Sequence, residues 1–303
     1  MVPEKFIGSL GGVKYTLDES MCNHTTFKIG GNADIMINVA DTKSLCDVVT
    51  SAKNCGVPYF IIGKGSNLLV SDDGIEGAVI SVSKISDIKI SGNRLVCGAG
   101  ANLAAVCVAA RDAGLSGLEF AFGIPGSVGG ALYMNAGAYG GEMSQVVAGA
   151  ECVAPDGKVI SVSKDEMALG YRTSAFKEKG LIITSVTFEL ECGDVGEINA
   201  TMQELLSRRK DKQPLEYPSA GSTFKRPVGH FAGALIEKNN LKGVGVGAAE
   251  VSVKHAGFVI NKGGATCKDV RALIKEIQRV VLENDGVQLE TEVIFVGRQG
   301  EEK

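Results

Sequence analysis

The feature that most constrains this chain is a glycine-rich stretch at residues 117–142, which reads GLEFAFGIPGSVGGALYMNAGAYGGE. Nine of its 26 residues are glycine or proline, so it cannot form one continuous helix or strand. Ile124, Val128, Leu132 and Met134 are apolar, so it is not a flexible linker either. Glycines let the backbone approach a ligand closely, and consecutive N–H groups can bind an anion. A turn-rich segment within a β-sheet explains the glycines equally well.

The residues that follow the glycine loop predict a short helix, from Ser127 to Met134. Its N-terminus would face the same site as the loop, and helix N-termini favour phosphate groups. The chain has 40 glycines in 303 residues, about 13% against roughly 7% on average. They cluster without a collagen period, which favours loops shaped around ligands. The flanking segments must decide between an anion-binding loop and an ordinary turn.

Length and charge narrow the class of protein. At 303 residues the chain exceeds the usual size of a single hydrophobic core, so two or three domains are expected. The formal net charge is −4, and the longest basic run is residues 208–210, which argues against a nucleic-acid or anionic membrane surface. The sequence contains no run of about 18 apolar residues, so no transmembrane helix is predicted. The N-terminus lacks the pattern of a secretion signal, so we expect a cytoplasmic protein.

Cysteine and histidine are scattered along the chain. The eight cysteines include no C-x-x-C pair, and the three histidines show no ligand spacing. Several cysteines fall in apolar periodic segments, where a free thiol packs as a small hydrophobic side chain. We therefore expect a reduced protein without a metal site.

The N-terminal two thirds predict an α+β unit. Asp41 is a plausible N-cap for a helix that ends near residue 54, with its apolar residues on one face. A buried strand at residues 59–62 then runs into Gly63-Lys-Gly-Ser-Asn-Leu-Leu69. A strand followed by a glycine loop suggests a phosphate-binding arrangement, but the segment is neither a Walker loop nor a complete G-x-G-x-x-G motif. By itself it fits a hairpin loop as well.

The rest of the pattern predicts short strands, few helices and a second domain. Further strands are predicted at residues 85–90, 94–97, 146–154, 158–162 and 182–190, and further helices at residues 102–113, 164–169 and 195–210. A break at residues 213–218 marks a domain boundary. Beyond it, helices at residues 230–238 and 266–284, the second closed by Gly286, and a last strand at residues 287–296 predict a second α+β domain.

Six segments that occur in order carry a resemblance to a known family. They are TTFKIGGNA at residues 25–33, GKGSNLL at 63–69, the glycine-rich stretch with MNAGAYG at 134–140, GYRTSAF at 170–176, AGSTFK at 220–225 and LETEV at 289–293. Together they closely resemble the UDP-N-acetylenolpyruvoylglucosamine reductases, a family of bacterial cell-wall flavoenzymes, over residues 20–297. The match is strong because all six segments lie at workable spacing.

The resemblance implies an α+β protein with a vanillyl-alcohol-oxidase-type FAD-binding fold. Two FAD-binding subdomains are expected at residues 1–72 and 73–196. A C-terminal α+β substrate-binding domain is expected at residues 210–303, with its last strand free to pack back on the first subdomain.

The resemblance also implies the reaction. NADPH would reduce non-covalently bound FAD, and the flavin would pass hydride to the vinyl carbon of UDP-N-acetylglucosamine enolpyruvate. The product would be UDP-N-acetylmuramate, a precursor of peptidoglycan. The flavin carries the redox chemistry, so the protein must position it, stabilise charge and supply a proton.

Three residues match the catalytic positions of the family. Hydride addition leaves negative charge over Cα and the carboxylate, and Arg172, a permanent planar cation, suits that charge. Glu292 would assist in charge stabilisation or proton supply, and Glu290 on the same strand face is its competitor. Ser222 would protonate Cα, although a serine hydroxyl is a poor acid. Without the resemblance, Arg172 and Glu292 would be taken for surface charges and Ser222 for a turn residue.

The resemblance also suggests residues that bind the cofactor and the substrate. For FAD they are Gly63, Lys64, Gly65, Ser66, Asn67, Leu68, Gly123, Ile124, Pro125, Gly126, Ser127, Gly129, Gly130, Asn135 and Ala136. For the substrate they are Tyr171, Arg172, Lys225, Arg208 and Lys212. Tyr133 and Tyr139 either stack on a ligand or pack in the protein, and the three lysine and arginine candidates other than Arg172 fit solvated surface charges equally well.

Two departures from the family pattern affect the expected site. Some members carry an extra loop whose tyrosine covers the substrate, but the short span between Arg172 and Pro214 leaves little room for it. The chain therefore resembles the shorter class, whose substrate lid the sequence does not identify. Phe122 also stands beside the glycine loop where a smaller residue is expected.

Two other functions fit the same residues. One is another oxidoreductase of this flavin fold, although such enzymes often attach flavin through histidine or cysteine, and neither residue occurs in the glycine loop. The other is a non-catalytic sensor of a UDP-sugar or nucleotide. For the reductase that the resemblance implies, the expected partners are the UDP-sugar enolpyruvyl ether and NADPH, with no nucleic acid or membrane partner and a monomer by default.

Overall fold

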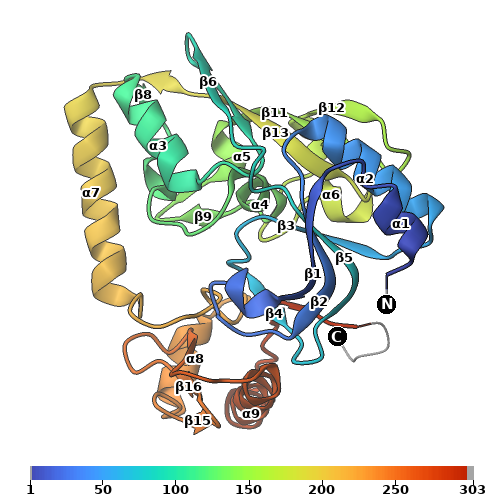
Figure 1. The fold of residues 1–303 in the computed structure, drawn as a ribbon. Helices are drawn as coiled ribbons and strands as arrows, with labels where there is room; N and C mark the ends of the chain where they lie inside the picture. Colours follow the sequence, from blue (N-terminus) through green and yellow to red (C-terminus); the bar gives the residue numbers. More distant parts are fainter. Residues whose placement is uncertain (1, 299–303) are drawn as a thin grey trace. The chain divides into compact units, whose positions relative to one another are not determined.

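The computed structural model describes residues 2–298, which form two compact units (Figure 1). Of the described residues, the first unit contains 2–16, 35–64 and 77–209, and the second contains 17–34, 65–76 and 210–298. Each unit has its own hydrophobic core. Because both units combine distant segments, the expected division at residues 1–72, 73–196 and 210–303 stays a prediction.

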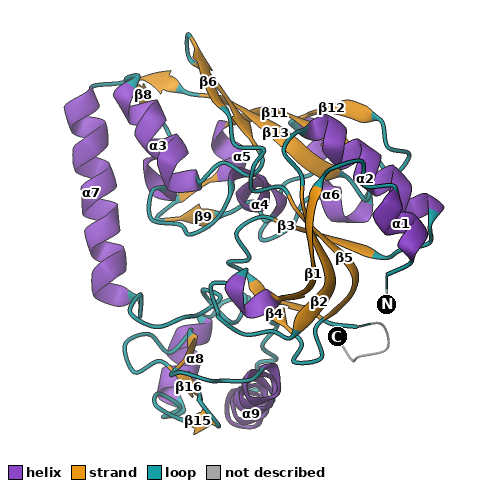
Figure 2. Cartoon of the chain, viewed as in Figure 1, coloured by secondary structure: helices purple, strands orange, loops and turns teal. Residues whose placement is uncertain are grey.

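The first unit is built on a five-stranded sheet with the order β12-β11-β13-β7-β6 (Figure 2). Its strands are β6 (Ile88–Ser91), β7 (Arg94–Gly98), β11 (Val147–Val153), β12 (Val159–Ser163) and β13 (Ile182–Glu189). Each neighbouring pair is antiparallel. The strands predicted at residues 85–90 and 94–97 pair as the hairpin β6–β7, and those predicted at 146–154 and 158–162 pair as the hairpin β11–β12, each across a short turn-forming segment.

The helices and minor strands of the first unit are short. The helices are α1 (Glu4–Gly8), α2 (Thr42–Asn54), α3 (Leu103–Asp112), α4 (Val128–Tyr133), α5 (Met143–Val146) and α6 (Ala175–Glu178), with 3₁₀ turns η2 (Glu119–Ala121) and η3 (Asp165–Met167). The strands are β3 (Tyr59–Ile62), β8 (Leu115–Ser116), β9 (Gly137–Ala138), β10 (Gly141–Glu142) and β14 (Glu191–Cys192). The helix predicted at residues 164–169 is thus a single 3₁₀ turn, and α1 is a helix that the sequence reading missed.

The prediction of α2 is confirmed together with its cap. Asp41 accepts a hydrogen bond from the backbone N–H of Ser44, and the Ser44 side chain completes a capping box. Leu45, Val48 and Val49 are buried on one face of the helix. The apolar spacing of 3.6 residues and the cap therefore act together to fix this element.

Several elements continue from one unit into the other. They are β1 (Lys14–Ser20), β2 (Asn32–Asn38), β5 (Ile75–Ser81) and α7 (Val195–Lys212). The strands belong to a sheet with the order β1-β2-β5-β3, in which β3 and β5 run parallel.

The second unit contains a three-stranded sheet, β15-β16-β17, a short helix α8 and a long helix α9. Its elements are η1 (Met21–Asn23), β4 (Leu68–Val70), α8 (Ala232–Lys238), β15 (Gly245–Val246), β16 (Ala249–Val251), β17 (Val259–Asn261), α9 (Cys267–Asp285) and β18 (Ile294–Val296). Helix α9 matches its prediction: Thr266 forms a capping box with Asp269, and Gly286 closes the helix in the left-handed conformation.

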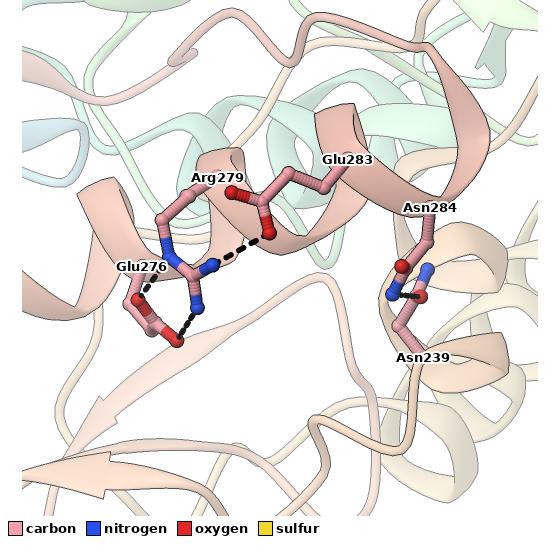
Figure 3. Close-up of polar contacts among 5 residues, drawn as sticks. All are labelled: Asn239, Glu276, Arg279, Glu283 and Asn284. Carbon is pink, nitrogen blue, oxygen red and sulfur yellow. Dashed lines mark hydrogen bonds and ion pairs between the residues drawn. The ribbon is translucent and has the colours of Figure 1, made fainter.

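Polar side chains near the C-terminal end of α9 contact one another and the end of α8 (Figure 3). Arg279 donates to Glu276 at 2.7 Å and to Glu283 at 2.6 Å, one turn before and after it. Asn284 donates to the side chain of Asn239 at 2.7 Å, which ties α9 to the end of α8.

The predicted last strand is shorter than expected. Strand β18 covers three residues and pairs in parallel with β4. Before it, Thr291 forms an isolated antiparallel bridge with Phe224, so residues 287–293 do not continue the ladder of β18. The pairing partner changes along the segment, which single-sequence periodicity does not reveal.

Four cysteines, Cys97, Cys107, Cys152 and Cys267, are buried, as expected for thiols that pack as hydrophobic side chains. Burial raises the pKa of Cys97, Cys107 and Cys152 to about 12, so these thiols stay protonated. Among residues 2–298, no helix is long and apolar enough to cross a membrane.

Candidate functional site

The glycine-rich stretch is a compact loop that leads into α4, as the sequence predicts. Ser127 caps the helix by accepting a hydrogen bond from the backbone N–H of Gly130 at 3.4 Å. The N–H of Gly129 donates to the Ala99 carbonyl at 2.8 Å. A Cβ on Gly129 would lie 2.8 Å from the Ala99 Cβ, so this position needs a glycine for close packing.

The loop after β3 has the properties of an anion cradle. Within the described residues, the backbone N–H groups of Gly63 to Asn67 donate to no acceptor. Gly65 has a φ of +61°, and a Cβ there would lie 2.1 Å from the His24 carbonyl oxygen. A loop whose consecutive N–H groups have no protein acceptor fits a phosphate or pyrophosphate group.

The two glycine-containing segments meet within the first unit. A Cβ on Gly63 would lie 2.2 Å from the Ser127 Oγ and 3.3 Å from its Cβ. The start of the first loop therefore packs directly against the N-cap of α4. Gly63 and Ser127, one from each of the two segments that share the FAD prediction, are therefore neighbours.

Arg172 lies in a tight turn of the first unit. The backbone N–H of Thr173 donates to the Gly170 carbonyl, and the N–H of Gly170 donates to the Thr173 carbonyl, at 3.3 and 3.1 Å. Arg172 has a φ of +54°, a left-handed conformation that is uncommon for a residue with a Cβ. Its guanidinium carbon lies 5.2 Å from the ring centre of Tyr171, which is 53% exposed.

Ser222 and Glu292 belong to neighbouring segments of the second unit. The N–H of Glu292 donates to the Thr223 carbonyl at 2.9 Å, so the backbones of residues 222–225 and 290–293 run side by side. The Asn67 side-chain amide donates to the Glu292 carbonyl at 3.1 Å, and the Asn67 carbonyl accepts from Ile294 at 2.9 Å. The end of the anion cradle therefore holds the strand segment that carries Glu292.

The competitor of Glu292 is engaged elsewhere. Glu290 forms an ion pair with Lys225 at 3.1 Å, and its side chain is 71% exposed. Glu292 is only partly exposed, which suits a group that acts on a bound ligand. Lys225 is one of the residues expected to contact the substrate, and it would have to exchange this exposed carboxylate for a ligand anion.

Helix α7 contributes three basic residues with different surroundings. Arg208 is exposed, with its guanidinium carbon 5.0 Å from the Tyr139 ring centre, and it pairs with Glu204 at 3.6 Å. Lys212 is exposed at the end of the helix. Arg209 is 7% exposed, and the sequence reading missed it.

Arg209 holds the glycine loop through a hydrogen bond to its backbone. Its Nη1 donates to the Gly123 carbonyl at 2.6 Å, and a Cβ on Gly123 would lie 3.0 Å from the Arg209 Cδ. Burial lowers the pKa of the guanidinium, and its Nε has no hydrogen-bond partner among the described residues. The available signal was helical spacing, because Arg209 shares the buried face of α7 with Ile198 and Met202.

Comparisons with known proteins agree on one family over most of the chain. Residues 33–163 match a family model described as FAD binding domain, and residues 213–296 match the C-terminal domain of UDP-N-acetylenolpyruvoylglucosamine reductase. The UDP-N-acetylenolpyruvoylglucosamine reductase of Clostridium botulinum (strain Hall) is 48% identical over 295 residues, which are 97% of this chain and 96% of the relative. The chain belongs to the UDP-N-acetylenolpyruvoylglucosamine reductase family.

Two further similarities support the same family. The UDP-N-acetylenolpyruvoylglucosamine reductase of Clostridium novyi is 49% identical over 281 residues, covering 93% of this chain and 92% of the relative. A crystal structure of the enzyme from Thermus caldophilus is 36% identical, with a TM-score of 0.80 over 94% of this chain and 98% of that chain. The predicted α+β, FAD-binding fold of the reductase family is therefore confirmed.

Within this reductase fold, the predicted cofactor residues differ in what they can offer. Pro125, Gly130 and Lys64 are exposed. The Asn135 side chain is 1% exposed and already bonded at both ends within the protein. The remaining predicted FAD positions are partly or fully buried and offer mainly backbone groups: Gly63, Gly65, Ser66, Asn67, Leu68, Gly123, Ile124, Gly126, Ser127, Gly129 and Ala136.

The aromatic candidates of the reductase site also separate by burial. Burial raises the pKa of Tyr133, whose ring packs against the core of the first unit, whereas Tyr139 is 39% exposed. Phe122 packs against the same core. His255 lies in the second unit, with its ring 5.0 Å from that of Phe258 and its Nδ1 accepting from the N–H of Gly257 at 3.1 Å.

Proposed function

We propose that this chain is a UDP-N-acetylenolpyruvoylglucosamine reductase that uses FAD and NADPH to form UDP-N-acetylmuramate for peptidoglycan synthesis. The observation that carries the proposal is identity of 48% over 97% of the chain, spanning both the FAD-binding part and the C-terminal domain. It acts in the cytoplasm as a monomer, on small-molecule partners alone.

The loop of residues 63–67 and the glycine segment of residues 123–130 would hold FAD. The loop fits the pyrophosphate because its backbone N–H groups have no acceptor among the described residues, and Gly65 keeps the backbone free of a Cβ. Bound FAD supplies hydride after reduction by NADPH. The protein must then orient the substrate and stabilise the negative charge that develops on it during the reaction.

Three side chains supply the remaining chemistry in this proposal. Hydride addition to the enolpyruvyl group leaves charge on Cα and the carboxylate. Arg172 balances that charge as a cation that does not deprotonate, with Glu292 as its partner in charge stabilisation or proton supply. Ser222 delivers a proton to Cα. Tyr171, Lys225, Arg208 and Lys212 are the proposed contacts for the substrate.

The test is a measurement of both half-reactions by stopped-flow absorbance. With Ser222→Ala, flavin reduction by NADPH should stay near normal, because no proton from Ser222 is used there. Reoxidation by the enolpyruvyl substrate should slow by roughly 10²–10⁴-fold, the range for general acid catalysis. Ser207→Ala, at an exposed position of α7, is the matched control and should change neither rate.

The outcomes separate the proposal from its competitors. Equal slowing of both half-reactions by Ser222→Ala would contradict the proton-donor role. Oxidation of NADPH without any dependence on the enolpyruvyl substrate would indicate another flavin-dependent oxidoreductase, and retention of yellow colour by the denatured protein would point the same way. A purified protein without flavin absorbance would indicate a non-catalytic sensor.

A further inference from the structure

The turn that carries Arg172 needs support from outside its own four residues. Arg172 has a φ of +54°, and the left-handed region is unfavourable for a residue with a Cβ. The two backbone hydrogen bonds between Gly170 and Thr173 close the turn, and side-chain hydrogen bonds of Asn135 and Ser174 join this segment to residues 133–135. The direction of the Arg172 side chain therefore depends on a second segment of the first unit.

Asn135 provides the first of these bonds. Its Nδ2 donates to the Gly170 carbonyl at 3.1 Å, and its Oδ1 accepts from the backbone N–H of Ser144 at 2.9 Å. The side chain is 1% exposed, and Asn135 itself has a φ of +42°. The amide nitrogen donates to a carbonyl and the amide oxygen accepts from an N–H, so the neighbouring backbone fixes the orientation of the amide.

Ser174, the residue that follows the turn, provides the second bond. Its Oγ donates to the Tyr133 carbonyl at 2.6 Å, and the residue is 5% exposed. Although Ser174 is the N-cap residue of α6, its side chain makes no cap hydrogen bond. Its hydroxyl is thus used to tie the turn to the end of α4 rather than to start its own helix.

We infer that Asn135 is a positioning residue for Arg172: its side-chain amide holds the Gly170 carbonyl and thereby fixes the strained turn that aims the guanidinium. This inference rests on the proposed role of Arg172 in balancing charge on the substrate. It assigns the Asn135 side chain to the substrate half of the reaction rather than to a bond with FAD. Ser174 acts in the same way with a single bond.

The inference has a chemical reason for asparagine over aspartate. Aspartate at position 135 would keep an acceptor for the Ser144 N–H. It would lose the donor to Gly170 and place a carboxylate oxygen against a carbonyl oxygen in a buried site, which is unfavourable. Asn135→Asp therefore removes one specific bond while it changes the side-chain volume very little.

The experiment is a double-mutant cycle on the FAD-loaded enzyme, with stopped-flow measurement of both half-reactions. Asn135→Asp should leave flavin reduction by NADPH within about twofold of wild type and slow reoxidation by the enolpyruvyl substrate at least tenfold. Arg172→Ala should slow reoxidation by roughly 10²–10³-fold, as for other lost donors to developing charge. The double variant should be no slower than Arg172→Ala alone, because positioning has no value once the guanidinium is gone.

A matched control comes from the second unit. Asn261 is also buried, and its Nδ2 donates to the Phe27 carbonyl at 3.1 Å while its Oδ1 accepts from the N–H groups of Gly263 and Ala265. Asn261→Asp should lower the unfolding temperature. Any effect that it has on the reoxidation rate should not depend on whether Arg172 is present. If Asn135→Asp does not fold, Ser174→Ala serves in the same cycle with the same expected pattern.

The results that overturn the inference are distinct from those that overturn the proposed function. Slowing by Asn135→Asp that multiplies with that of Arg172→Ala, or equal slowing of both half-reactions, would show a general structural role. A normal reoxidation rate in Asn135→Asp and Ser174→Ala would also refute it. If Arg172→Ala alone has no effect, the role of Arg172 and this inference both fail while the activity stands. A wild-type enzyme that does not oxidise NADPH with the enolpyruvyl substrate fails the proposed function itself.

Discussion

Gly63→Ala is the substitution whose effect can be worked out most directly from the structure. The new Cβ would lie 2.2 Å from the Ser127 Oγ, so the hydroxyl must leave its present position. The backbone of Gly63 does not have a positive φ, so an alanine there meets no conformational strain of its own. The cost therefore comes from what happens to Ser127.

Two losses follow when the Ser127 hydroxyl moves. The N-cap bond to Gly130 contributes on the order of 0.5–1 kcal/mol, at the low end for caps because its length is 3.4 Å. Ser127 is 3% exposed, so a hydroxyl without a new partner costs about 1–3 kcal/mol more. The reduced entropy of the unfolded chain offsets about 0.4–1 kcal/mol. The net destabilisation is about 1–3 kcal/mol, with the buried hydroxyl as the larger loss.

The physical argument makes a sharper prediction for a pair of substitutions. Ser127→Gly alone should cost only a few tenths of a kcal/mol, because glycine is an acceptable N-cap. The double variant Gly63→Ala/Ser127→Gly has no hydroxyl to displace, so it should return to within about 0.5 kcal/mol of wild type. Ser127→Ala keeps a Cβ at 3.3 Å from the new methyl group and should rescue only in part.

The assay is thermal unfolding of the flavin-free protein by circular dichroism, with the same variants repeated at one fixed FAD concentration. For a domain of about 150–250 residues, each kcal/mol corresponds to roughly 2–4 °C in Tm. The expected loss for Gly63→Ala is therefore about 2–12 °C, and it should largely disappear in the double variant. Additive losses in the double variant would refute the reasoning, because they would show that the clash with Ser127 is not the cause.

Three further predictions use other contacts. Arg209→Met should change Tm little, because the lost bond to Gly123 is offset by removal of a buried charge. The same variant should weaken FAD binding at least tenfold in an equilibrium titration. An unchanged affinity for FAD would contradict a supporting role for Arg209. Burial lowers the pKa of His255, so the folded protein favours the neutral ring and its stability should fall as pH drops below about 6.5. Between pH 7.5 and 5 the urea midpoint of His255→Gln should therefore change less with pH than that of wild type. An equal pH dependence in the two proteins would exclude His255 as the cause. Arg279→Ala should leave the urea midpoint at the wild-type value, because its two glutamate contacts are exposed; a clear loss would show that the network in Figure 3 is more than a solvated surface.

The candidate site was predictable from sequence to different degrees. Six short segments in order identified the reductase family, because a family pattern is a property of residue order alone. Roles for Arg172, Ser222 and Glu292 came from that pattern and stay predictions. The contacts around these residues could not be predicted from that pattern. For example, the ion pair between Glu290 and Lys225 joins residues 65 positions apart, and nothing in either segment indicates it.

The sequence by itself determined the elements whose signals are local. The N-cap at Asp41 was predicted, and the helices predicted to start at Ser127 and Thr266 are capped by these residues, because a cap side chain bonds to backbone within three residues of itself. The same holds for α9, whose apolar spacing and closing glycine lie within one segment. The strand predicted at residues 287–296 failed for the opposite reason, because its pairing partner changes along its length.

The tertiary structure alone decided which polar groups hold the functional loops. Arg209 reaches the Gly123 carbonyl over 86 residues of sequence, Asn135 reaches Gly170 over 35, and Asn67 reaches Glu292 over 225. Each acceptor is a backbone carbonyl, which every residue has, so no residue type at the far end marks the contact. The glycine-rich stretch could thus be recognised from its composition, whereas the bonds from Arg209 to Gly123 and from Asn135 to Gly170 became visible only once the chain was folded.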